Sequence, residues 1–414
     1  MSGLTALVGQ FARSLPPGRA SKRLLSVAFV DSVGTGLFLA GSALFFTRAL
    51  HLSVTQVGLG LSMSGLAGLL CSVPIGKAAD RIGGLRTLVA LQAWRGICFI
   101  AYPFVRGFTT FVLVACLVGA AEWAVGPITQ AVVGIIEEGT SRIRTMAVMA
   151  SVRNAGFTVG ALLATCAIST SSAFAYRALV LVDAMSFLVT AAMLARLPLR
   201  QGSAAAKGHP VGSKILRLRN ISYLLLSACN GALYLHTALL TVGIPLWIAT
   251  QTHAPRTLVG SVILVNTLLV IVLEVRLSRG VDDVVQASRK QRWAGCSLAL
   301  CCVLVSVTGS LDAAPSSVLL IVAMVALTAG EIWQSVGSWG LSYGLSPESQ
   351  RSGYLSVYSL GATGATVVGP GLVTYAVVQA GPVGWLGLAA VFAAIGSVVP
   401  GVARHARRHA AMPG

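Results

Sequence analysis

The chain has 414 residues, of which 55% are hydrophobic and only 10% are charged, whereas an ordinary soluble domain carries about 25% charged residues. A soluble fold cannot bury so much apolar surface, and the absence of charged tracts or a repeated Gly-X-Y pattern excludes disordered and fibrous proteins. The formal net charge of +18 would indicate a nucleic-acid-binding protein only if the basic residues lay on one folded domain. No loop of the sequence is long enough to form such a domain.

Long apolar runs recur along the whole chain. Because about 20 apolar residues cross a bilayer as a helix, the sequence predicts an all-α membrane protein with twelve transmembrane helices. The expected spans are 24–48, 54–78, 86–106, 108–134, 146–170, 174–196, 220–249, 257–277, 292–311, 315–342, 354–379 and 382–403.

A polar stretch near the midpoint separates the first six spans from the last six. It contains Gly202, Lys207 and Pro210, which are typical of a linker. No small-residue cleavage site follows a short apolar core near the start, so we expect no signal peptide. The predicted parts are an N-terminal arm at 1–23, a six-helix bundle at 24–196, a linker at 197–219, a second six-helix bundle at 220–403 and a tail at 404–414.

The basic residues predict the orientation in the membrane. With the N-terminus inside, 25 of the 30 Lys and Arg residues fall in inside segments and four fall outside. The four are Arg48, Arg106, Arg177 and Arg256, and Arg95 remains within a span. This distribution follows the positive-inside rule, so we expect a multi-pass protein of the cell membrane, in bacteria the inner membrane, with both termini, the linker and the tail in the cytoplasm.

The two halves of the chain resemble each other locally. Residues 119–123 read GAAEW and residues 329–333 read AGEIW, which aligns Glu122 with Glu331 at an offset of 209. Arg142 and Arg351 follow at the same offset. Duplicated halves with parallel topology are a common transporter design, although Gly-rich and Ala-rich membrane helices also match by chance.

An ionisable side chain at the centre of a membrane-spanning helix costs about 2.5–3.5 kcal/mol in translocon-insertion experiments. Each such residue is therefore a candidate for a functional or structural role. Those expected near the midplane are Arg95, Glu122, His236 and Glu331. Those nearer the cytoplasmic side are Asp31, Arg153 and Glu274, and those nearer the outside are Arg177 and Asp183. The candidates for proton coupling are Glu122, Glu331, Asp31 and His236. The alternative role for each is a buried pair that holds two helices in register.

A small-molecule substrate is expected to meet polar and aromatic side chains near these acids. Arg95 is suited to hold an anionic substrate or to act as the counter-ion of Asp31 or Glu122. Trp123, Trp333 and Asn154 are the further candidates for substrate contact, although aromatic residues in membrane helices often pack against neighbouring helices or lipid.

No cofactor, metal site or enzymatic centre is expected. The eight cysteines lie in apolar runs without a CxxC pair or a histidine at ligand spacing, so they are expected to be buried thiols. The chain also lacks GxSxG, HExxH and a phosphate-binding Gly-Lys-Ser/Thr sequence.

One loop carries a family motif. Residues 76–86, between the second and third spans, read GKAADRIGGLR. This resembles the cytoplasmic loop signature of the major facilitator superfamily, and the resemblance extends to twelve spans in two halves. It implies two six-helix bundles related by a pseudo-two-fold axis. It also implies a conformational latch, or gating loop, formed by Gly76, Asp80, Arg81, Gly83 and Arg86.

Other positions depart from the family pattern. Gly84 and Leu85 replace residues that are usually basic, and the equivalent loop at 276–283 keeps charge and glycine without the motif order. Drug/proton antiporters of the superfamily carry an arginine in span four and Gly-Pro in span five. Here span four has no arginine, and Gly369-Pro370 lies in span eleven.

The resemblance implies a secondary transporter that works as a monomer by alternating access. The expected function is export of a small, partly apolar organic compound, a drug or a metabolite, by proton antiport, with protons, the substrate and the lipid bilayer as partners. The alternatives are an importer or uniporter of a nutrient, in which the acids are structural, and a membrane receptor that does not transport.

Overall fold

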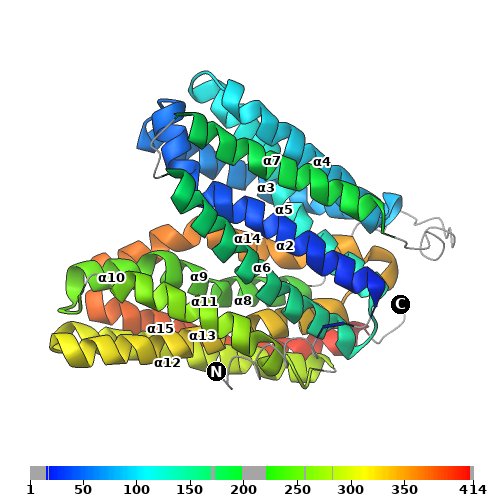
Figure 1. Ribbon diagram of the computed structural model, residues 1–414. Coiled ribbons are helices and arrows are strands. Elements are labelled where there is room, and N and C mark those ends of the chain that lie inside the picture. Colours follow the sequence, from blue (N-terminus) through cyan, green and yellow to red (C-terminus); the bar gives the residue numbers. More distant parts are fainter. Residues whose placement is uncertain are drawn as a thin grey trace, which may run out of the picture. The chain divides into compact units, whose positions relative to one another are not determined.

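The computed structural model describes residues 15, 16, 18–168, 173–197, 221–255, 258–281 and 283–410, and the regular elements of this part are all helical (Figure 1). The first half contains α2 (Arg19–Leu44), α3 (Val54–Ile82), α4 (Gly84–Ala101), α5 (Phe108–Ile136), α6 (Thr140–Ile168) and α7 (Ala173–Ala195). The second half contains α8 (Ile221–Tyr234), α9 (His236–Ala238), α10 (Ile244–Gln251), α11 (Leu258–Leu277), α12 (Val284–Val307), α13 (Ala313–Gly344), α14 (Arg351–Val378) and α15 (Gly381–Ala410).

Within the described residues, eleven helical stretches are long and apolar enough to cross a membrane, with α8 to α10 forming one of them, Ile221–Gln251. The remaining long helix is α4, in which Arg86, Gln92 and Arg95 lower the hydropathy. Since α4 lies between two of the crossing helices, the arrangement agrees with the predicted all-helical, twelve-span class.

The contacts between helices divide the chain into two compact units. The first unit comprises Met1–Leu216 and Pro347–Ser356, and the second comprises Arg217–Ser346 and Val357–Gly414. The first turns of α14 therefore pack with the first unit, which the sequence did not predict. The predicted linker lies outside the described residues except for Leu197, as do most of the predicted arm and the last four residues of the tail.

Polar residues fix several helix ends. Ser53 and Gln56 form a capping box at the start of α3, and the Asp283 carboxylate accepts the Gln286 N–H at 2.8 Å at the start of α12. Gly83 joins α3 directly to α4 with a φ of +105°, a conformation that residues with a Cβ rarely adopt.

In the first unit, α2 packs along α6 and α7, α3 along α5, and α4 along α7. Aromatic rings fill the space between α2, α4, α5 and α7. The ring centroids of Phe99 and Phe187 lie 5.0 Å apart, and those of Phe46 and Phe111 lie 4.9 Å apart, both edge to face, which is a favoured aromatic geometry. This aromatic cluster borders the polar site described below.

In the second unit, α12 packs against both α13 and α15. The buried Trp247 ring lies 5.9 Å from that of Trp385, and its Nε1 donates to Thr308 Oγ1 at 2.9 Å. Helices α8 and α14 cross at close range, where Ser227 Oγ donates to the Tyr358 carbonyl at 2.8 Å and accepts the Gly361 N–H at 3.2 Å.

The helix predicted at 220–249 is not continuous. It is interrupted at Leu235, between α8 and α9, and a π-helical turn at Leu239–Gly243 precedes α10. A second π-helical turn, Phe45–Ala49, follows α2. Interrupted helices and π-turns are frequent at functional sites, and His236 is the first residue after the interruption.

Candidate functional site

Arg95 on α4 is the centre of a polar cluster in the first unit. Its Nη1 lies 3.3 Å from Asp31 Oδ1 on α2, and its Nη2 lies 3.4 Å from Glu122 Oε1 on α5. The exposed fractions of these side chains are 4% for Arg95, 16% for Asp31 and 43% for Glu122. The structure therefore brings together three of the predicted site residues, with both acids sharing one arginine.

Two neighbours make further contacts with Arg95, whose Nε has no hydrogen-bond partner among the described residues. Gln92 Oε1 accepts from Arg95 Nη1 at 2.8 Å, while Gln92 Nε2 donates to Asp31 Oδ1 at 2.7 Å. The guanidinium carbon lies 3.9 Å from the centroid of the Phe187 ring on α7, so the arginine also has a cation–π contact. Neither residue stands out in the sequence, because a single glutamine or phenylalanine in an apolar run gives no signal of its own.

Asp183 on α7 adds a third acid. It is fully buried, it acts electrostatically on Arg95, and its Oδ1 accepts from Ser186 Oγ at 3.2 Å. The sequence placed Asp183 nearer the outside and gave it no role. A buried arginine thus lies among three carboxyl groups.

A cavity of about 20 Å³ adjoins Asp31 and Gln92, with Thr129 and Arg153 in its wall. One water molecule needs roughly 10–15 Å³ of such space and two to four polar partners. The cavity therefore has the size and the lining to hold a water molecule against the Asp31 carboxylate.

Glu331 on α13 lies in a polar cluster of the second unit. Asn266 Nδ2 on α11 donates to Glu331 Oε2 at 2.8 Å and to Thr328 Oγ1 at 3.0 Å. Although Glu122 and Glu331 repeat in the sequence, the first pairs with an arginine and the second with an amide. Their surroundings in the two units therefore differ.

Two further ionisable groups belong to this second cluster. His236 is 3% exposed, Glu331 acts on it electrostatically, and the Gln334 side chain lies next to its ring. Glu274 on α11 is 2% exposed, and Glu331 is the charged group that acts on it. Among the described residues, no lysine or arginine forms an ion pair with Glu274 or Glu331.

The predicted substrate contacts are half-buried in the structure. Trp123 packs so closely on Gly68 that an added Cβ there would lie 1.9 Å from the indole. The Trp333 ring lies 5.7 Å from that of Trp293. Asn154 Nδ2 donates to the Ala150 carbonyl on its own helix at 3.1 Å, which leaves its Oδ1 as an acceptor for another molecule.

The motif loop contacts the start of α14. The two carboxylate oxygens of Asp80 accept the backbone N–H groups of Ser352 and Gly353, each at 2.8 Å. Both partners belong to the first unit. A carboxylate at a helix N-terminus satisfies unpaired N–H groups and interacts favourably with the helix dipole.

The other motif residues support this contact or lie at the surface. A Cβ added to Gly76 would lie 2.2 Å from Ser356 Oγ and 2.9 Å from the Ser352 carbonyl oxygen, so the glycine permits the close approach of α3 to α14. Gly83 forms the turn between α3 and α4. Arg81 and Arg86 are exposed on either side of this turn.

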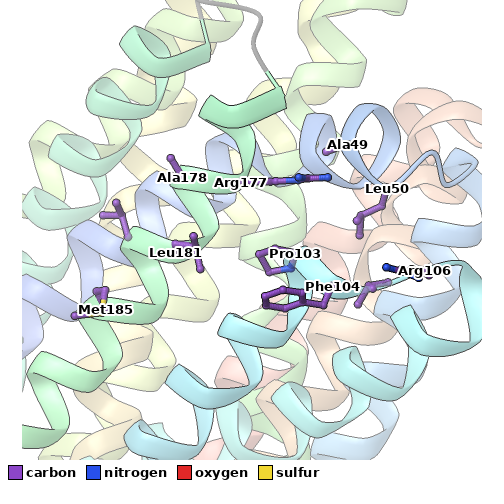
Figure 2. Close-up of a pocket in the computed structure, with 11 residues that line it drawn as sticks. Ala49, Leu50, Pro103, Phe104, Arg106, Arg177, Ala178, Leu181 and Met185 are labelled. Carbon is purple, nitrogen blue, oxygen red and sulfur yellow. The ribbon is translucent and has the colours of Figure 1, made fainter.

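A second cavity of the first unit shares no lining residue with the cavity beside Asp31. Its volume is about 740 Å³, and it lies in the first unit between the segment after α2, the segment after α4 and the first turns of α7 (Figure 2). Arg106 and Arg177 line it, and no acidic residue does.

The described cysteines give no sign of redox or metal chemistry. Seven are free thiols, of which Cys98, Cys301 and Cys302 are buried. The expectation of burial is wrong for the other four, because Cys71, Cys116 and Cys229 are half-buried and Cys296 is exposed. The Cys166 side chain lies outside the described part. No group of three or more His, Cys, Asp or Glu residues within that part is arranged to hold a metal ion.

The chain matches the family model described as Major Facilitator Superfamily over residues 24–279. It is similar to the Escherichia coli (strain K12) protein named uncharacterized MFS-type transporter YdeE, with 23% identity over 354 residues, 84% of this chain and 87% of that protein. It is also similar to multidrug resistance protein MdtG of Enterobacter lignolyticus (strain SCF1), with 29% identity over 205 residues, 47% of each chain.

Solved structures share the fold. A bacterial homologue of the iron transporter ferroportin, in an outward-facing state, has a TM-score of 0.74 at 14% identity, with 94% of this chain and 100% of that chain covered. At this identity the likeness concerns the helical fold alone.

Proposed function

The chain belongs to the Major Facilitator Superfamily, and from this premise we propose that it is a secondary transporter that exports a small, partly apolar organic compound in exchange for protons. In alternating access, the substrate site opens to one side of the membrane at a time. The similarity to a protein named for multidrug resistance supports an organic compound as the substrate. We also propose that the protein acts as a monomer in the inner membrane with both termini in the cytoplasm, in keeping with its charge distribution.

The excess of acids over bases around Arg95 is the observation that carries this proposal. Asp31, Glu122 and Asp183 lie around Arg95, and Arg153 is a further base near Asp31, so the acids would outnumber the bases if all of them were ionised. Uncompensated charge within a membrane protein is costly, and protons are the simplest counter-charge. Because two carboxylates share Arg95, one of them can bind a proton while the other keeps the arginine paired.

Glu122 is the acid best suited to exchange its proton against a substrate. Its side chain is 43% exposed, compared with 16% for Asp31, and the indole of Trp123 follows it directly in the sequence. A cationic compound near Trp123 would favour loss of the Glu122 proton, because a nearby positive charge stabilises the carboxylate.

The second cluster supplies further proton-binding groups in this proposal. Glu331 and His236 interact with each other electrostatically, and the buried Glu274 extends the cluster. Without a lysine or arginine partner in the described structure, the buried Glu274 is best accommodated when it carries a proton. Trp333, two residues after Glu331, corresponds to Trp123 as a substrate contact, and Asn154 offers its free Oδ1.

We propose that the Asp80 contact favours one conformational state of the transport cycle. It joins the end of α3 to the first turn of α14 through two charge-assisted hydrogen bonds. A conformational change that separates these elements must break both bonds.

Reconstitution in liposomes with an imposed pH gradient tests the proposed function. We expect uptake of a fluorescent cationic compound against the proton flux, and loss of both fluxes in Glu122→Gln or Glu331→Gln. Glu138→Gln, a change of an exposed loop acid, should leave both intact.

Other outcomes would assign another function. Substrate flux in the direction of the proton flux would identify an importer, and flux that is independent of pH would identify a uniporter. Binding of the compound without any flux would identify a receptor.

A further inference from the structure

The 740 Å³ cavity of the first unit has the chemistry of an amphiphile site. It lies at the helix ends that the charge distribution predicts to face the outside, between Leu50, Phe104 and the first turns of α7. Figure 2 shows the Arg177 side chain extending from α7 toward the segment that carries Ala49 and Leu50. Neither the acid clusters nor the motif loop contribute to its wall.

Two arginines give the cavity its charge. Arg106 and Arg177 both line it and both are exposed, and neither guanidinium group has an ion pair or hydrogen bond within the described residues. No acidic side chain lines the cavity to compensate them. Two unpaired arginines at one cavity are suited to bind the phosphate of an anionic ligand, because the guanidinium group donates in a fork that matches phosphate oxygens.

An apolar track continues from the charged end along α7. Arg177, Leu181 and Met185 follow at intervals of four residues and therefore lie on one face of the helix. Leu181 is 41% exposed and Met185 is 55% exposed. The track is about 12 Å long at a rise of about 1.5 Å per residue, close to the depth of one leaflet, about half of a 30 Å hydrocarbon core.

We propose that this cavity binds one anionic phospholipid, with its phosphate between Arg106 and Arg177 and one acyl chain along Leu181 and Met185. A soluble anion would leave the apolar track uncovered. A zwitterionic lipid carries its own cation, which opposes two unpaired arginines. The proposal does not depend on proton-coupled export, since it concerns a different site.

Lipid retention measured by native mass spectrometry tests the proposal. The purified protein is delipidated and titrated with phosphatidylglycerol or with phosphatidylcholine of the same acyl chains. We expect one phosphatidylglycerol per protein to be retained in preference to phosphatidylcholine. Arg106→Gln/Arg177→Gln should weaken this retention by roughly tenfold or more, since each arginine near a lipid surface contributes about 1 kcal/mol, or about a factor of five.

Two matched variants separate the site from general charge effects. Arg106→Lys/Arg177→Lys keeps the charge without the guanidinium fork and should retain more of the binding than the glutamine variant, which also shows that the site tolerates substitution. Arg289→Gln/Arg292→Gln removes two exposed arginines from α12 of the second unit and should retain the bound lipid.

Three results would overturn the proposal. They are equal retention of the two lipids by the unaltered protein, equal loss of lipid in both arginine-to-glutamine double variants, and displacement of the lipid by millimolar inorganic phosphate. The last result would indicate a site for the phosphate group alone. Each result is independent of whether the protein transports anything.

Discussion

The carboxylate of Asp80 accepts the backbone N–H of Gly353 at 2.8 Å, although the two residues are 273 positions apart in the chain. With the neighbouring bond from Ser352, this contact caps α14 with a side chain from the end of another helix. The cap therefore fixes a tertiary contact as well as a helix end.

Asp80→Ala should lower the free energy of unfolding by about 1–2 kcal/mol, the usual cost of losing a cap together with its charge at a helix N-terminus. Asp80→Asn should cost less because it keeps one acceptor. Thermal unfolding in detergent measures both. Asp312→Ala is the control, since Asp312 precedes α13 without a side-chain cap bond; an equal loss there would show that the Asp80 contact adds nothing specific.

Arg95→Gln should be among the most destabilising substitutions in the first unit. Removing one partner of a buried ion pair costs about 3–5 kcal/mol because it leaves buried charge uncompensated, and here Asp31 and Glu122 both lose their partner. The melting temperature of the purified protein should fall accordingly.

A double variant distinguishes charge from packing at the same site. Arg95→Gln/Asp31→Asn should recover part of the lost stability, because it removes one unpaired charge. The charge argument would be contradicted if the double variant were less stable than Arg95→Gln by the same free energy of unfolding that Asp31→Asn alone removes from the unaltered protein.

Gly361→Ala should destabilise the second unit by about 1–3 kcal/mol. Its new Cβ would lie 1.8 Å from the Ser227 carbonyl oxygen, so α8 and α14 would have to move apart. Gly364→Ala, one turn later on α14, meets nothing within 4 Å and should gain up to about 1 kcal/mol from helix propensity. Thermal unfolding that ranks these two variants in the opposite order would show that the helices do not cross closely at Gly361.

Glu274→Gln should leave the melting temperature almost unchanged while it reduces proton exchange. The amide has the shape of the protonated acid, and no lysine or arginine of the described structure loses a partner. Infrared difference spectra should lose the carbonyl band of a protonated carboxyl group, and Glu138→Gln should keep that band. A fall in stability as large as that of Arg95→Gln would show instead that Glu274 is an ionised partner in a pair.

The sequence was most informative about residues that are energetically costly to place inside a membrane and about long apolar runs. Apolar length predicted the helices, and the cost of a charge in the bilayer drew attention to Arg95, Asp31 and Glu122, which do meet. The resemblance pointed to Asp80, but its partner at Ser352 and Gly353 is a backbone contact across more than half of the chain. No local pattern encodes such a contact.

The remaining features depend on how helices face each other. Asp183 and Phe187 become part of the Arg95 site only because α4 packs on α7, whereas Gln92 lies on α4 itself, three residues before Arg95. Glu274 was visible as an intramembrane acid, but its burial beside Glu331 depends on the packing of α11 against α13. A single sequence indicates how far along a membrane-spanning helix such a residue lies. It does not indicate which neighbouring helix its side chain faces.

The π-helical turn at Leu239–Gly243 has a consequence for the interior of the second unit. Such a turn accommodates one residue more than an α-helical turn, so the side chains that follow are rotated by about 100° relative to an unbroken helix. Trp247 follows it by four residues and is 1% exposed, against the ring of Trp385. The direction of this tryptophan thus depends on the number of residues in the turn, and deletion of one residue there would rotate the indole away from its partner.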